Sequence, residues 1–161
     1  MRIHKPGLTW LGATGMPVGT EPLYDPATGP WADEPDHIVF RCGDFPCHIS
    51  RSLVLGHLNG YVGVPAGHPY YGMGADDPRV DALVVHGGIT WAAGRLPWAE
   101  ENMAENRWYW FGFDAAHWGD WVPSWPEQRG CVYRDVESMQ AECETLAAQL
   151  ARAVTDRCER S

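Results

Sequence analysis

The sequence predicts an α+β protein, with an antiparallel β-sheet and glycine-rich loops packed against one long C-terminal amphipathic helix. Three observations favour this fold. Short β-prone runs separated by Gly and Pro fill residues 37–130, an apolar stripe with helical spacing runs through 135–158, and Gly and Pro recur throughout 1–36. With 161 residues, we expect one domain made of an irregular N-terminal arm, a sheet with its site loops, and the helix.

The N-terminal arm, residues 1–36, cannot hold a long helix because Pro and Gly interrupt it every few residues. We expect ordered but irregular chain that is fastened to the rest by large apolar side chains. These are Trp10, Leu11, Leu23, Tyr24 and Trp31.

Five short runs have the apolar, β-branched or aromatic side chains that are typical of strands. They cover residues 37–41, 47–55, 59–65, 80–85 and 107–113. Pro65 ends the third run, because proline cannot donate a hydrogen bond to a neighbouring strand. The polar or Gly/Pro-rich stretches between the runs are expected to be loops, the longest of them at 93–106 and 114–130.

The C-terminal helix has the clearest pattern. Asp135 is a good N-cap, acidic residues gather near the start and arginines near the end, as the helix dipole favours. Apolar residues recur at three- and four-residue steps: Val136, Met139, Cys143, Leu146, Leu150 and Val154. We expect this stripe to pack on the sheet. A coiled-coil partner is the alternative, but the stripe lasts about three heptads, which is near the lower limit.

Charge and cysteine content narrow the partners and the compartment. The chain has 21 acidic and 12 basic residues, a formal net charge of -9, and its arginines are scattered singly. A nucleic-acid polymer is therefore not an expected partner, although two arginines could still hold a small anion. Five cysteines without a CxxC motif indicate reduced thiols in the cytoplasm. No membrane span is visible, and the oligomeric state stays open.

Three glycine-flanked polar clusters follow predicted strands. They are 67–72, which contains His68, the trio 86–88 (His-Gly-Gly), and 114–120. Glycine lets backbone approach a ligand closely and exposes its N–H groups. Because loops held on a rigid sheet are the usual place for functional sites, we expect the three clusters to form one.

The third cluster has the strongest chemical pattern, since Asp114, His117 and Asp120 follow one another at three-residue steps. A carboxylate fixes the tautomer of a histidine and raises its basicity. Joined by His86 and a water, these residues would form an acid/base pair or hold a divalent metal ion of unspecified identity. The alternative is that both carboxylates cap loop N–H groups while His117 bonds to backbone. The candidate catalytic residues are His86, Asp114 and His117.

A ligand would also need flat contacts and hydrogen-bonding groups. The nine tryptophans suit either an aromatic core or stacking on a flat ligand. The candidate ligand-binding residues are Asn59, Tyr61, His68, Gly87, Gly88, Trp110 and Asp120. A zinc site at Cys42, Cys47, His48 and His57 is not favoured, because these spacings match no zinc ribbon or finger.

The same clusters carry a resemblance to a known family. The strings LGHLNGYVGVP (55–65), GHP (67–69), VHGGIT (85–90) and WFGFDAAH (110–117), with the Gly-Asp pair at 119–120, resemble an uncharacterised family of small proteins encoded by bacteriophages and prophages. The resemblance spans roughly residues 48–151. It implies a phage protein in the cytoplasm of a host bacterium and no particular activity. Members of that family often carry Cys where this chain has Ala115, so the resemblance favours no thiol-based mechanism here.

Three functions fit these features. The first is a phage accessory protein that binds a small nucleotide-like host molecule in an aromatic, His/Asp-lined pocket, as a means of countering host defence. The second is a His/Asp hydrolase of a phosphoester-type substrate, with or without a metal ion. The third is an acidic inhibitor of a host protein, motivated by the net charge. The first two depend on His86, Asp114 and His117 lying in one place.

Overall fold

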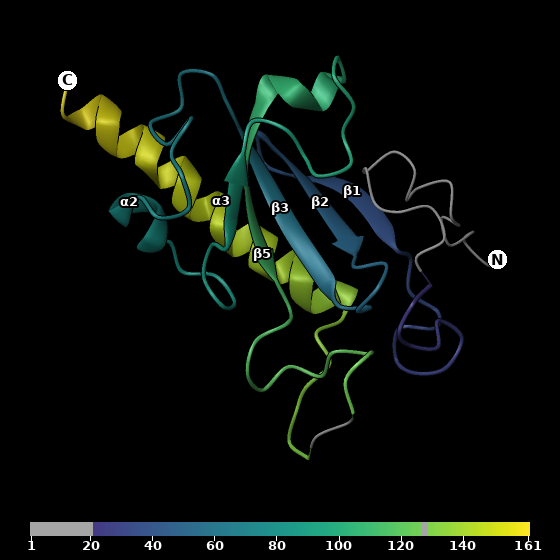
Figure 1. The fold of residues 1–161 in the computed structure, drawn as a ribbon. Coiled ribbons are helices and arrows are strands. Elements are labelled where there is room, and N and C mark those ends of the chain that lie inside the picture. The colour runs from purple at the N-terminus through teal and green to yellow at the C-terminus, as the bar shows by residue number, and fades with distance from the viewer. Residues whose placement is uncertain (1–20, 127–128) are drawn as a thin grey trace.

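A computed structural model describes residues 21–126 and 129–161 and contains a five-stranded antiparallel sheet that packs against one long helix (Figure 1). The strands are β1 (His37–Cys42), β2 (Phe45–Arg51), β3 (Leu58–Pro65), β4 (Trp91–Ala93) and β5 (Trp108–Asp114). Their order in the sheet is β1-β2-β3-β5-β4, and each neighbouring pair is antiparallel. The predicted α+β class is confirmed.

Four of the five predicted strands form close to their expected positions, although β2 begins and ends before the predicted 47–55. The prediction of a strand at 80–85 is wrong. Its start belongs to α2 (Pro78–Asp81), a single turn in which Asp77 accepts a hydrogen bond from the backbone N–H of Arg79. The run stays apolar because three of its side chains are buried in the core: Val80, Leu83 and Val85. The cluster 86–88 therefore follows this turn and not a strand.

Strand β4 is an edge strand that the sequence did not predict, and it pairs with β5. It has three residues, too few for a strand pattern to show. The expected loop at 93–106 leads into a short 3-10 helix, η1 (Ala104–Arg107), directly before β5.

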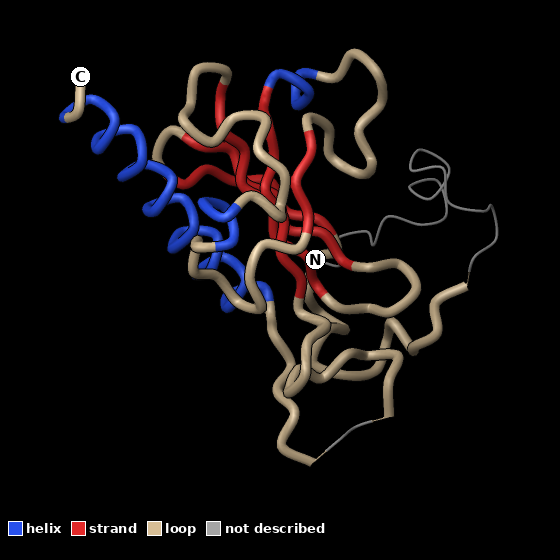
Figure 2. Tube along the Cα trace, turned by 60° about the vertical axis from the view of Figure 1, so that its left-hand side comes forward, coloured by secondary structure: helices blue, strands red, loops and turns tan. Residues whose placement is uncertain are grey.

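The two faces of the sheet are covered by different parts of the chain. One face packs on the helix α3 (Val136–Glu159), and Figure 2 shows this long helix along one side of the strands. Its central row is Cys47, Val62 and Phe111, which are paired across β2, β3 and β5. The opposite face is covered by the connection between β4 and β5. A second core forms there from Tyr61, Leu96, Trp98, Ala99 and Trp110.

Helix α3 begins as predicted, with Asp135 accepting a 2.8 Å hydrogen bond from the N–H of Ser138. Its buried residues are Met139, Cys143, Leu146, Ala147 and Leu150. The prediction that the whole stripe packs on the sheet is wrong at the C-terminal end of the helix, because Val154 is 40% exposed. The C-terminal turns of the helix run past the sheet (Figure 1), so they leave this part of the stripe uncovered by it.

Within the described part of the arm, residues 21–36 form neither helix nor strand. Trp31 is buried and fastens the arm through edge-on contacts with Trp121 and Tyr133. Leu23 is 67% exposed, against expectation. Trp10 and Leu11 lie outside the described residues.

A buried arginine connects the arm to the sheet. Arg51 of β2 donates to Asp36 at 2.7 Å and to Glu34 at 3.0 Å. The other carboxylate oxygen of Glu34 accepts the N–H of Val136, the first residue of α3. Arg51 also donates to the hydroxyl of Tyr133, so one guanidinium links arm, sheet and helix start.

Among the described residues, no helix is both long and apolar enough to cross a lipid bilayer. None of the five cysteines, all of which lie in the described part of the chain, forms a disulfide.

Candidate functional site

Three side chains from two separate loops come together beside the sheet: His86, His117 and Asp120. One nitrogen of each imidazole and one oxygen of the carboxylate all lie within 4.8 Å of one another. His86 Nε2 is 2.8 Å from Asp120 Oδ2, and the two imidazole rings meet edge to face with 5.7 Å between centroids. The second and third glycine-flanked clusters therefore meet, as the sequence analysis expects.

Asp120 is the centre of this group; the residue is 4% exposed, and both of its carboxylate oxygens make hydrogen bonds. Oδ2 faces His86 Nε2 and accepts the backbone N–H of His117 at 2.9 Å, while Oδ1 accepts from Arg134 Nε at 3.1 Å. Burial by itself raises the pKa of this carboxyl, but the three hydrogen bonds outweigh burial and lower the pKa of Asp120 below its usual value. Asp120 is therefore a buried carboxylate anion at neutral pH.

His117 has one ring nitrogen without a hydrogen-bond partner. Its Nδ1 is buried, lies 3.4 Å from Asp114 Oδ1 and 3.8 Å from Asp120 Oδ2, and bonds to neither. A buried polar atom left unpaired costs free energy on the order of 1–3 kcal/mol. An imidazole nitrogen of this kind, beside a carboxylate and a second imidazole, has the chemistry of a metal ligand.

The loop after β5 is shaped by its own carboxylates. Asp114, the last residue of β5, accepts the N–H of Ala116 and the hydroxyl of Thr90. The N–H of Asp120 bonds to the carbonyl of His117 and closes a tight turn. Both aspartates thus cap loop N–H groups, as the alternative interpretation states, but the His117 side chain does not bond to backbone.

The other loop is held by the helix. The backbone N–H of His86 donates to Glu142 of α3 at 2.9 Å. Gly87 and Gly88 then have φ values of +69° and +80°, which L side chains rarely adopt. At Gly87, a Cβ would lie 2.2 Å from Cε1 of His117, so the glycine backbone forms one wall against that ring.

Asn59 of β3 is paired with Asp114 of β5, so its side chain is on the same face of the sheet as that of Asp114, which lies 3.4 Å from His117 Nδ1. His57 appears in the sequence analysis only in the zinc site that is not favoured, and not as a neighbour of this cluster; His57 is buried and its Nδ1 has no hydrogen-bond partner. Burial lowers the pKa of His57, and the charge of Asp114 acts in the opposite direction. A lone histidine without a repeated spacing gives no sequence signal.

The remaining predicted ligand-binding residues are not part of this group. Trp110 is fully buried in the second core and donates its ring N–H to the carbonyl of Glu105. Tyr61 is buried in the same core, where burial raises its pKa to about 12. Both rings therefore serve packing in this structure.

His68 lies at the opposite end of the sheet. Its Nε2 is 2.9 Å from the carbonyl oxygen of Leu150, whereas His86 is held by Glu142. Eight residues of helix separate these two points, which corresponds to about 12 Å. The first glycine-flanked cluster therefore does not join the other two.

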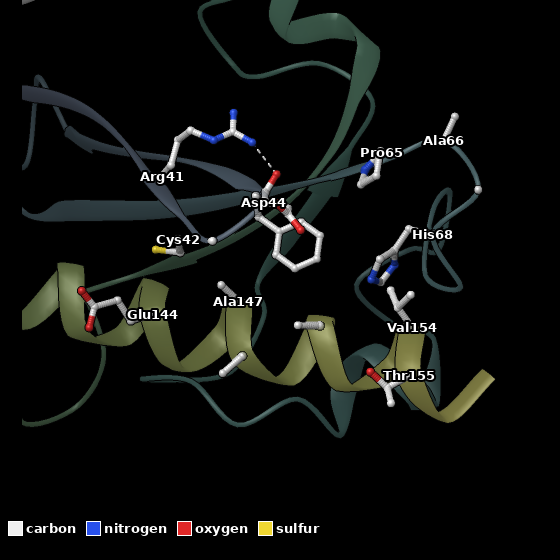
Figure 3. Close-up of a pocket in the computed structure, with 15 residues that line it drawn as sticks. Arg41, Cys42, Asp44, Pro65, Ala66, His68, Glu144, Ala147, Val154 and Thr155 are labelled. Atoms are coloured by element: carbon white, nitrogen blue, oxygen red, sulfur yellow. Dashed lines mark hydrogen bonds between the residues drawn. The ribbon is translucent and has the colours of Figure 1, made fainter. Parts of the chain in front are cut away.

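His68 lines a cavity of about 1000 Å³ between α3, the β1–β2 turn and the chain after β3. Figure 3 shows the His68 ring among the lining side chains. This cavity is separate from the group formed by His86, His117 and Asp120, since it shares no lining residue with that group.

Ala115 has a packing role. It is 3% exposed in the helix-side core, because alternation along the extended chain turns it away from Asp114. A side chain at this position packs with the core and does not face the histidines.

Comparison with known proteins gives no match among protein-family models, curated proteins or solved structures.

Proposed function

We propose that this protein holds a divalent transition-metal ion at His86, His117 and Asp120 and uses it to hydrolyse a small phosphoester. The observation that carries the proposal is the convergence of two imidazoles and one buried carboxylate, with one imidazole nitrogen left unpaired. Two histidines with one carboxylate are a common ligand set of catalytic zinc and non-haem iron centres.

The distances fit a metal site. With bonds of about 2.0–2.1 Å and tetrahedral angles, ligand atoms stand about 3.3 Å apart. The distance from Asp120 Oδ2 to His86 Nε2 is 2.8 Å, and that to His117 Nδ1 is 3.8 Å, so the two values bracket this spacing. All three ligand atoms lie within 4.8 Å of one another, so side-chain adjustments would bring the set to this spacing.

The surroundings support the ligands. Arg134 holds the second oxygen of Asp120, and Glu142 anchors the backbone of His86. Such outer contacts orient ligands and strengthen metal binding. With three protein ligands, a transition metal bound here would keep a position for water and would lower the pKa of that water toward neutrality. Asp114 Oδ1 lies 3.4 Å from His117 Nδ1, the proposed ligand atom, so this carboxylate is placed to accept a proton beside the metal position.

The exposed ring of Trp118 indicates the class of substrate. Trp118, next to His117 in sequence, is fully exposed, and an indole left in water is suited to stacking on a flat base. Together with the resemblance to phage proteins, this favours a small nucleotide-like phosphoester of the host, and a role in countering host defence.

Metal binding is tested first. Titration calorimetry with Zn²⁺, Mn²⁺ and Co²⁺ should show one ion per chain, and Co²⁺ should give visible ligand-field absorption. His117→Ala and Asp120→Asn should each weaken binding by roughly 100-fold or more, since even outer contacts are worth 10–100-fold. His48→Gln is the matched control, because His48 belongs to β2 and lies outside the group. Unchanged affinity in His117→Ala would refute the site.

Turnover is tested next with bis(4-nitrophenyl) phosphate and a panel of nucleotides. Hydrolysis should need the metal and should disappear in His117→Ala while circular dichroism stays the same. The second candidate, binding without hydrolysis, is favoured by the exposed ring of Trp118. It predicts a nucleotide that raises the melting temperature and is recovered unaltered. Full turnover in His117→Ala contradicts the hydrolase proposal.

A further inference from the structure

Arg134 is the cation of the candidate site, and Asp120 takes up only one of its donors. Its Nε donates to Asp120 Oδ1 at 3.1 Å. A guanidinium has five N–H donors, and the other four sit on its two terminal nitrogens. Within residues 21–126 and 129–161 these two nitrogens have no hydrogen-bond or ion-pair partner, and the side chain is 37% exposed. Charged donors beside the proposed metal position are therefore accessible to a ligand.

The backbone on each side of Arg134 is fixed by contacts that do not involve the proposed metal ligands. Tyr133 donates its hydroxyl to Glu34 at 2.6 Å. Asp135 is the N-cap of α3 and accepts both the N–H and the hydroxyl of Ser138. A side chain that starts from a fixed backbone loses less conformational freedom when it binds a ligand, so it binds at a lower cost.

The same stretch of chain is joined by backbone hydrogen bonds to the loop that carries Asp120. Asp120 and Val132 form a parallel bridge, in which the N–H of Trp121 donates to the carbonyl of Val132 and the N–H of Val132 donates to that of Gly119. These bonds do not depend on the Arg134 side chain. A substitution of Arg134 should therefore leave the loop in place, and circular dichroism can check that the fold is kept.

Negative charge surrounds the proposed metal position. Three carboxylates contact the group: Asp114, Asp120 and Glu142. A divalent ion would bring two positive charges, so these carboxylates would still exceed it by one formal charge. Among the described residues, Arg134 is the one arginine that forms an ion pair with this group. Surplus negative charge repels an anion, so the attraction of an anionic substrate to this place depends on Arg134.

We propose that Arg134 binds the phosphoryl group of the substrate through its terminal nitrogens while its Nε holds Asp120, an inference that rests on the proposed function. Oδ2 of Asp120 faces His86 and the proposed metal position, and Oδ1 faces Arg134, so one small carboxylate stands between the two. A phosphoryl group also carries its oxygens on one atom, and it can direct one oxygen to the metal position and another to Arg134. The substrate class is an anionic phosphate monoester or diester, because a neutral triester has no charged oxygen for the guanidinium.

Phosphate binding tests the proposal, with inorganic phosphate as the probe. Calorimetric titration of the Zn²⁺-saturated wild-type chain should show that phosphate binds. Arg134→Gln should weaken this binding at least about tenfold, because charge-assisted hydrogen bonds are lost. Arg152→Gln is the matched control, since it removes the same charge from an exposed position of α3 and should bind phosphate like the wild type. A wild-type chain that binds no phosphate, or an Arg134→Gln variant that binds it equally well, overturns the proposal.

Lysine separates contact with phosphate from support of Asp120. Arg134→Lys keeps one charged donor for the carboxylate and loses the paired N–H groups that match two phosphate oxygens. It should bind Zn²⁺ within about threefold of the wild type and bind phosphate at least about tenfold more weakly. Because Zn²⁺ is saturating in the phosphate titration, a role limited to holding Asp120 would leave the phosphate affinity unchanged, and that result overturns the proposal.

Turnover distinguishes this proposal from the proposed function. In Arg134→Lys, the KM for bis(4-nitrophenyl) phosphate and the inhibition constant of inorganic phosphate should rise together, at least about tenfold. If Zn²⁺-dependent turnover occurs and neither constant changes, Arg134 does not bind the substrate and the hydrolase proposal stands. If phosphate binding depends on Arg134 but no ester is hydrolysed, the binding role of Arg134 stands and the hydrolase proposal fails.

Discussion

Gly87 sets the position of the His117 ring, although it carries no side chain itself. Its φ of +69° excludes most residues, and a Cβ there would lie 2.2 Å from the imidazole. Gly88 has the same left-handed backbone, with φ +80°, but open space where a Cβ would be. Substitutions at these two glycines therefore distinguish the effect of backbone strain, which both share, from displacement of the His117 ring, which only Gly87 would cause.

Alanine at these two positions makes a matched pair. Each substitution should cost about 1–3 kcal/mol of unfolding free energy through strain at positive φ. Gly87→Ala should in addition weaken metal binding roughly tenfold or more, because it pushes a proposed ligand aside. Urea unfolding and metal titration measure both effects. Equal metal affinity in the two variants would mean that the Gly87 backbone does not position His117.

At the scale of elements, the spacing of apolar residues in the sequence predicted the helix and strands that bury one face of their surface in the core. The stripe of α3 and the aromatic strand β5 are such cases. The prediction of a strand at 80–85 failed because three apolar residues of this run, Val80, Leu83 and Val85, are buried in the core from a turn and not from a strand. The three-residue β4 is below the length at which alternation is visible.

The sequence also predicted the site only in part. Glycine flanking and carboxylate spacing indicated that 86–88 and 114–120 carry polar groups of interest. The contact of His86 with Asp120 joins residues 34 positions apart, and the anchor from Glu142 spans 56. Such contacts depend on how long loops fold over the sheet, and no local pattern encodes that. His68 was assigned to the same site because its glycine-flanked cluster also follows a strand. Strands β3 and β5 are antiparallel, so the loops that follow them lie at opposite ends of the sheet.

The packing of α3 yields a prediction at this scale. Leu146 is fully buried against the sheet, so Leu146→Ala should lower the unfolding free energy by 2–5 kcal/mol, through lost burial and a cavity of roughly methyl-group size or larger. The urea midpoint should fall with little change in the slope of the transition.

Thr145→Ala is its control on the same helix. Thr145 is exposed, and its hydroxyl bonds back to the carbonyl of Ala141, a contact that adds little to helix stability. This variant should stay within about 0.5 kcal/mol of wild type. Two variants of equal stability would contradict the packing of α3 on the sheet.

For the whole molecule, two histidines on the face opposite α3 link stability to pH. His37 Nε2 and His48 Nδ1 lie 3.0 Å apart, and both rings contact Trp98. Burial, followed by the charge of His37, lowers the pKa of His48 to about 4, and burial also lowers the pKa of His37. The unfolded chain takes up these protons near pH 6.5.

The native state should therefore lose stability as the pH falls from about 6.5 to about 4, because the unfolded state binds more protons in this window. The loss attributable to His48 is on the order of 3 kcal/mol at 1.36 kcal/mol per pKa unit. Urea unfolding at pH 7 and pH 4.5 measures it. In His48→Gln, which cannot be protonated, the difference between the two pH values should shrink. An unchanged difference would show that His48 is not the source.

The guanidinium of Arg51 has a consequence for how the chain can be shortened. It is 3% exposed, and its two carboxylate partners, Glu34 and Asp36, both come from the segment before β1. A shorter protein that starts at the sheet would keep a cation sealed in its interior with no anion to balance it, at a cost of about 3–5 kcal/mol. The smallest autonomous folding unit therefore includes residues upstream of the first strand, and any expression boundary has to be drawn before Glu34.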